Sequence, residues 1–121
     1  MDLNPKGVGG ATLAMASGRI DLSNSDDFTT ALSAALTGTR TALILDLSKV
    51  DFISSAGLRS LVIAQKAAKT ENKGFGIAAL PPMLVEIFSI ARLNHMMPIF
   101  QTTREAVAKL APDALAQFDM G

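Results

Sequence analysis

The decisive stretch of the sequence spans residues 45–58 and reads Leu45-Asp46-Leu47-Ser48-Lys49-Val50-Asp51-Phe52-Ile53-Ser54-Ser55-Ala56-Gly57-Leu58. It begins inside an apolar run, residues 42–45, which is too short for a helix and apolar on both faces. Such a run is typical of a central strand that is covered on both sides. Ser54 and Ser55 stand where the next helix should begin, and hydroxyl side chains commonly cap helices. The stretch therefore predicts a buried strand followed by a helix.

The same alternation of strands and helices continues on either side. Upstream we expect an edge strand within residues 3–8, a strand over 11–17 and a helix from the polar residues 21–27 to about 36. Downstream we expect a helix from Ser54 or Ser55 to about 72, a strand over 75–79, a helix opening at Pro81-Pro82, a strand over 97–101 and a last helix opening at the capping box of residues 102–105.

This order predicts an α/β fold: a mixed or mostly parallel sheet of four to five strands, packed with about four helices. A length of 121 residues and 49% apolar residues suit a single domain that covers residues 1–121. We place its core within about residues 11–110. Pro112 should end the last helix and leave residues 111–121 as a loose C-terminal tail.

The composition excludes several classes of partner. Eleven basic and eleven acidic residues leave no net charge to attract nucleic acid or an anionic membrane surface. The absence of cysteine removes thiolate nucleophiles and cysteine-ligated metals. We find no export signal and no run of 18 apolar residues, so we expect a cytoplasmic protein that does not contact a membrane.

Motifs for catalysis or cofactor binding are missing as well. The only histidine, His95, lies in a connection, whereas nucleophilic hydrolysis needs a base beside the nucleophile. The sequence has no phosphate-binding loop, no dinucleotide fingerprint and no nucleophile elbow around Ser55. The aspartates lack the spacing of a metal site. We therefore expect no catalytic residue, no metal and no cofactor, and a protein that is not an enzyme.

The decisive stretch resembles the signature of the STAS domains, a family named for sulphate transporters and anti-sigma factor antagonists. That signature runs roughly Asp-Leu-Ser-x-Val-x-Phe-Ile-Asp-Ser-Ser/Thr-Gly-Leu. The positions that agree here are Asp46, Leu47, Ser48, Val50, Phe52, Ile53, Ser55, Gly57 and Leu58. Residues 17–21, Ser17-Gly18-Arg19-Ile20-Asp21, also resemble the family's turn before its first helix. The resemblance covers about residues 11–110.

The resemblance implies a regulatory role for Ser55, which falls on the serine that a partner kinase phosphorylates in anti-sigma factor antagonists. The unphosphorylated protein would bind an anti-sigma factor that is also a serine protein kinase of histidine-kinase-like ATPase fold, and so free a sigma factor. Phosphorylation would break the complex, and a serine phosphatase would restore it. Ser54 stands where the family often has Asp, and Ala56 where it has a second Ser or Thr. Ser54 is therefore the alternative site of modification.

A phosphate on Ser55 would sit at a helix N-terminus, where anions are favoured, so we expect it to change binding and not folding. The candidate partner-facing residues are Asp21, Ala56, Gly57, Leu58 and Arg59. Because Gly57 has no side chain, we expect it to leave room for the close approach of the partner.

Two alternatives stay open at this point. Ser54 or Ser55 could serve only as the helix cap, in a STAS scaffold or small-ligand module of a larger signalling assembly. Methionine adapts to varied shapes, so Met83, Ile90, Met96 and Met97 could line a pocket or a dimer patch. Filling of the core is the favoured interpretation of these four residues.

Overall fold

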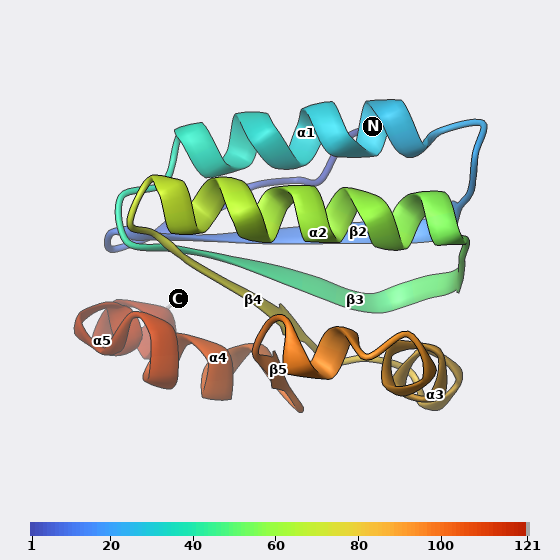
Figure 1. Ribbon diagram of the computed structural model, residues 1–121. Coiled ribbons are helices and arrows are strands. Elements are labelled where there is room, and N and C mark those ends of the chain that lie inside the picture. The colour runs from blue at the N-terminus through green and yellow to red at the C-terminus, as the bar shows by residue number, and fades with distance from the viewer. Residues whose placement is uncertain (121) are drawn as a thin grey trace.

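A computed structural model describes residues 1–120 as an α/β fold with one five-stranded sheet (Figure 1). The strands are β1 (Lys6–Val8), β2 (Ala11–Ile20), β3 (Ala42–Ile53), β4 (Gly74–Ala78) and β5 (Ile99–Phe100). Their order across the sheet is the order in the chain, so β3 is the central strand. β1 pairs antiparallel with β2, and the other three pairings are parallel. The predicted mixed sheet with a central third strand is confirmed.

Helices cover both faces of this sheet. The helices are α1 (Ser25–Thr37), α2 (Ser55–Thr70), α3 (Pro82–Ile90), α4 (Thr103–Leu110) and α5 (Leu115–Met120), with short 3-10 turns at Leu93–His95 and Pro112–Ala114. In Figure 1, α1 and α2 lie side by side on one face, while α4 and α5 lie on the other. Along α1, Phe28, Leu32 and Leu36 recur every four residues and are buried, so one stripe of the helix faces the sheet.

The two faces of β3 serve two separate clusters of buried side chains. Leu43, Leu45 and Leu47 point to the larger cluster, beneath α1, α2 and α3. Ile44 points to the smaller cluster, with Val107 of α4. Successive side chains of a strand alternate between its faces, so a continuous apolar run fits a strand that is covered on both sides.

β2 and β3 extend further than the sequence suggested, because their two ends pair with each other. We expected residues 17–21 to turn, but β2 continues to Ile20, which pairs with Ile53 at the end of β3. Both isoleucines are buried, and the polar residues before them are accommodated by register shifts in the pairing. Gly18 adopts a φ of +78°, a conformation that favours glycine, at one of these shifts. Residues 45–53 of the signature stretch therefore belong to the long strand β3, and residues 55–58 form the first turn of α2.

The expectation of a loose tail is wrong for residues 111–120. After Pro112 the chain forms a 3-10 turn and then α5. Ala111 and Ala114 are buried in the smaller cluster together with Val8 of β1. The physical reason is that α4 leaves the β1–β2 side of this face open, and the last segment covers it. The core thus extends beyond residues 11–110 at both ends, and Gly121 lies outside the described residues.

The four residues that were expected to fill the core differ in their burial. Met97 is buried in the larger cluster, whereas Met83, Ile90 and Met96 are exposed. The favoured interpretation is therefore right for Met97 alone, because the side chains that α3 buries fully are those of Leu84 and Phe88.

No helix within residues 1–120 combines the length and the apolar character that crossing a membrane requires.

Candidate functional site

The candidate site lies at the edge of the sheet where β2 and β3 end. Because these strands are parallel, the loops that lead from them into α1 and α2 meet at the same edge, on the right in Figure 1. The backbone N–H of Ser54 donates to the carbonyl of Ile20 at 2.8 Å and joins the two connections directly. Residues 21–22 and 54–55, which are far apart in the sequence, thus lie at the same end of the sheet.

The two serines at the start of α2 have different roles. Ser54 is extended, with φ −86° and ψ 172°, and its Oγ accepts a hydrogen bond from the N–H of Gly57 at 3.3 Å. Ser54 is therefore the N-cap of the helix. Ser55 is the first helical residue and is exposed, and within residues 1–120 its hydroxyl makes no hydrogen bond. Both hydroxyls could be predicted from the sequence as candidates, and the structure shows that Ser54 is the one that caps the helix.

The start of α2 is suited to hold negative charge on Ser55. Among the hydrogen bonds of the described chain, those at this helix start use the N–H groups of Gly57 and Leu58 but not those of Ser55 and Ala56. The first turn carries no acidic residue, and α2 is 16 residues long. Unpaired N–H groups and the helix dipole together favour an anion at such a position.

Asp21 begins a tightly hydrogen-bonded turn beside Ser54. Its Oδ1 accepts hydrogen bonds from the Ser23 hydroxyl and from the Ser23 N–H at 3.0 Å. The Asn24 side chain accepts from the Asp21 N–H at 2.9 Å and donates to the Arg19 carbonyl at 2.8 Å. The hydrogen bonds from Ser23, its hydroxyl first, lower the pKa of Asp21, and the nearby Arg19 cation lowers it further. Asp21 is therefore a carboxylate held in a fixed turn.

Arg19 ties this turn to β3, a contact that the sequence analysis missed. The Arg19 Nε lies 3.8 Å from the Asp21 carboxylate, and its Cζ lies 4.4 Å from the centre of the Phe52 ring. Arg19 and Phe52 are cross-strand partners. A cation over an aromatic ring is attracted by the ring's negative face. The contact follows from the register of β2 on β3, which no spacing in the sequence reveals.

The predicted partner-facing residues do not all reach the surface. Arg59 is exposed and Ala56 is half-buried, but Leu58 also packs against the core. Gly57 is buried, and a Cβ there would lie 2.7 Å from Ile53 Cγ1 and 2.8 Å from Ile20 Cγ2. The expectation that Gly57 leaves room for a partner is wrong, because the ends of β2 and β3 already fill that room.

Hydroxyl contacts fix α1 against α2 behind this surface. The Thr29 hydroxyl donates to the Ser60 Oγ at 2.6 Å, and the Ser60 hydroxyl lies 3.2 Å from the carbonyl of Ser25. The start of α1 is thereby held at Ser60, five residues along α2 from Ser55. The loop between β2 and α1 is thus anchored at both of its ends.

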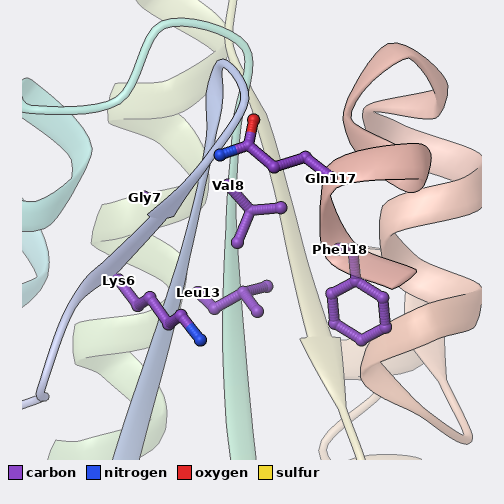
Figure 2. Close-up of a pocket in the computed structure, with 6 residues that line it drawn as sticks. All are labelled: Lys6, Gly7, Val8, Leu13, Gln117 and Phe118. Atoms are coloured by element: carbon purple, nitrogen blue, oxygen red, sulfur yellow. The ribbon is translucent and has the colours of Figure 1, made fainter. Parts of the chain in front are cut away.

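Other features of the molecule lie away from this edge. Between the β1–β2 hairpin and α5 a shallow groove of about 300 Å³ is lined by Lys6, Gly7, Val8, Leu13, Gln117 and Phe118 (Figure 2). It lies near the start of β2, at the opposite end of the strand from Ser55. Across residues 1–120, no three potential metal-ligating side chains come together. 

The chain is similar to proteins described as anti-sigma factor antagonists. One relative, “Putative anti-sigma factor antagonist BtrV” of Bordetella bronchiseptica, is 28% identical over 115 residues, which cover 95% of this chain and 98% of the relative. The crystal structure of an anti-sigma factor antagonist from Mycobacterium paratuberculosis superposes with a TM-score of 0.80 at 26% identity, over 88% of this chain and 90% of that one.

A third similar protein, the Bacillus cell fate determinant SpoIIAA, has been solved in two forms. The TM-score is 0.65 for the unphosphorylated form, at 15% identity, over 88% of this chain and 94% of that one. It is 0.66 for the phosphorylated form, at 17% identity, over 88% of this chain and 96% of that one. At these identities the similarity shows a common fold. The STAS domain family itself matches residues 2–106, most of the chain, and this protein therefore belongs to the STAS domain family.

Proposed function

We propose that this protein is an anti-sigma factor antagonist that is switched by phosphorylation of Ser55. In its unphosphorylated form it binds an anti-sigma factor, which releases a sigma factor. That partner is also a serine kinase of histidine-kinase-like ATPase fold, and it phosphorylates Ser55. The observation that carries the proposal is the exposed Ser55 hydroxyl, which is free of hydrogen bonds within residues 1–120 and lies at the start of α2.

Ser55 is a better substrate than Ser54 for geometric reasons. A kinase must bring the hydroxyl oxygen into its own active site, and Ser55 is exposed whereas Ser54 is half-buried. The Ser54 Oγ also holds the helix cap through Gly57, so its modification would remove a hydrogen bond on which α2 depends. Modification at Ser55 leaves that cap in place.

Phosphorylation at this position acts on binding and leaves the fold intact. A phosphate adds a charge of about −1.5 to −2 and three acceptor oxygens, next to the N–H groups of Ser55 and Ala56 that hydrogen bonds within the chain leave free. In the free protein these groups and water accommodate the dianion. In a complex the dianion would have to lose its water against the partner's surface, which weakens the complex. SpoIIAA, a protein of this fold, has been solved in a phosphorylated form, which supports the retention of the fold.

The chemistry of the switch belongs to the partners in this proposal. The anti-sigma factor supplies ATP and the metal that accompanies it, and a serine phosphatase removes the phosphate. The STAS protein itself acts in the cytoplasm as a substrate and a binding module, not as an enzyme.

Binding measurements on charge variants of Ser55 test the proposal. Each histidine-kinase-like ATPase of the host is purified, and its Kd is measured by calorimetry for the wild type, Ser55→Ala and Ser55→Asp. Ser33→Asp, at an exposed position of α1, serves as the charge control. We expect one ATPase to bind the wild type, Ser55→Ala and the control alike, and to bind Ser55→Asp at least about tenfold more weakly. All variants should melt at similar temperatures.

Equal affinity of this ATPase for Ser55→Ala and Ser55→Asp would contradict the switch. A small molecule that copurifies with the protein and occupies the groove beside α5 would favour the alternative, a ligand-binding STAS module.

A further inference from the structure

Leu22 is an apolar side chain displayed on a polar turn. Leu22 is 81% exposed. It stands between Asp21 and Ser23, and the Ser23 N–H donates a hydrogen bond to the Asp21 carboxylate. Its side chain belongs to neither cluster of the core, so within the described chain the fold gains nothing from a leucine here. A single exposed leucine is unremarkable by itself, and the backbone around Leu22 is what distinguishes it.

That backbone is ordered before any partner arrives. The Asp21 carboxylate accepts from Ser23, and the Asn24 side chain bridges the Asp21 N–H and the Arg19 carbonyl. These bonds hold the residues on both sides of Leu22. An anchor on a rigid turn loses less conformational entropy on binding than one on a flexible loop.

The turn lies against the start of α2 at two points. On one side of Leu22, the carbonyl of Ile20 accepts from the Ser54 N–H at 2.8 Å. On the other side, the carbonyl of Ser25 lies 3.2 Å from the Ser60 hydroxyl. Leu22 is therefore displayed at the same end of the sheet as Ser55, where one partner can cover both residues.

We propose that Leu22 is an anchor for the anti-sigma factor and inserts into an apolar recess on that partner. This inference rests on the proposed function and extends it, because it names the apolar contact that the Ser55 charge controls. Burial of Leu22 requires removal of water from the surrounding surface. A phosphate dianion on Ser55 keeps that surface hydrated and so opposes the burial.

Binding by Leu22 variants to the anti-sigma factor identified with Ser55→Ala tests the anchor. We expect Leu22→Ser to weaken binding about tenfold or more, which corresponds to the loss of most of a buried leucine side chain, and Leu22→Met to stay within about threefold of the wild type. Met120→Ser is the matched control, because Met120 is 88% exposed and lies on α5, on the other face of the sheet. The melting temperatures of all three variants should match the wild type, because both side chains are exposed.

The outcomes separate this inference from the function on which it rests. If Leu22→Ser binds as tightly as the wild type while Ser55→Asp does not, the anchor is wrong and the switch stands. If no ATPase binds the wild type, both proposals fail. A second copy of this chain is the competing occupant, and sedimentation would reveal it as a wild-type dimer that Leu22→Ser dissociates. That result would overturn the proposal.

Discussion

At the scale of single residues, the proposed switch divides two tasks, capping of the helix and phosphorylation, between two adjacent serines. The Ser54 Oγ accepts from the helix backbone, and its side chain is half-buried. Ser55 follows in the helix, so its side chain points away from the cap and into solvent. A phosphorylatable hydroxyl must be free to enter a catalytic site, whereas a cap must stay in place. The separation allows α2 to remain capped in either state of Ser55.

This division predicts different effects of two alanine variants on stability. Ser54→Ala should lower the free energy of unfolding by about 1 kcal/mol, because it leaves the Gly57 N–H without its acceptor. Ser55→Ala removes no hydrogen bond of the described chain and should change that free energy by less than about 0.5 kcal/mol. Urea denaturation followed by circular dichroism measures both. Ser54→Asp retains a side-chain oxygen that can cap the helix, so it should lower the free energy of unfolding by less than Ser54→Ala. Equal losses in the two alanine variants would show that Ser54 does not cap α2.

The sequence could locate this pair of hydroxyls but could not assign their tasks. The change from an apolar strand to a helix start is visible in the pattern of residues 45–58. Which serine caps the helix depends on the backbone angles of Ser54, whose N–H is hydrogen-bonded to the Ile20 carbonyl. That bond joins two loops more than 30 residues apart, and no local spacing encodes it. The burial of Gly57 against Ile20 escaped prediction for the same reason.

At the scale of elements, the C-terminal segment shows how a face of the sheet orders residues that have little helical pattern of their own. α5 is only six residues long and buries no residue fully. Isolated helices of that length are not stable in water, so its order comes from packing. Phe118 and Leu115 contact the smaller cluster, and Arg104 of α4 makes two hydrogen bonds of 3.0 Å with Asp119.

Apolar packing should therefore stabilise α5 more than the ion pair between Arg104 and Asp119 does. We predict that Phe118→Ala lowers the free energy of unfolding by about 1 to 2 kcal/mol, in keeping with a half-buried aromatic side chain. Arg104→Ala should lower the free energy of unfolding by less, because Arg104 and Asp119 are both largely exposed and solvent screens the attraction between them. Urea denaturation of the two variants ranks them. A larger loss for Arg104→Ala would show that the ion pair holds α5.

The sequence predicted elements well where one face of a segment is strongly apolar. The stripe of α1 and the apolar run of β3 each identify their element without tertiary information. Residues 17–21 and 111–120 lack such a pattern, and their structure comes from neighbours: the end of β3 for the first, and the sheet face beside β1 for the second. Their sequence therefore suggested a turn and a loose tail.

At the scale of the whole molecule, the parts that stabilise the fold are separate from the proposed docking surface. The two apolar clusters lie on the two faces of the sheet, whereas Ser55 and Leu22 are exposed where β2 and β3 end. Changes of charge at that edge need not disturb either cluster. This arrangement is what a protein needs if a modification is to change its partners without unfolding it.

The most direct test places a phosphate on Ser55 itself and measures binding and stability on the same sample. We predict that the phosphorylated protein binds its anti-sigma factor at least about tenfold more weakly than the unphosphorylated protein, with a melting temperature that differs by only a few degrees. Unchanged affinity would rule out the Ser55 switch, and so would a loss of binding that is accompanied by unfolding.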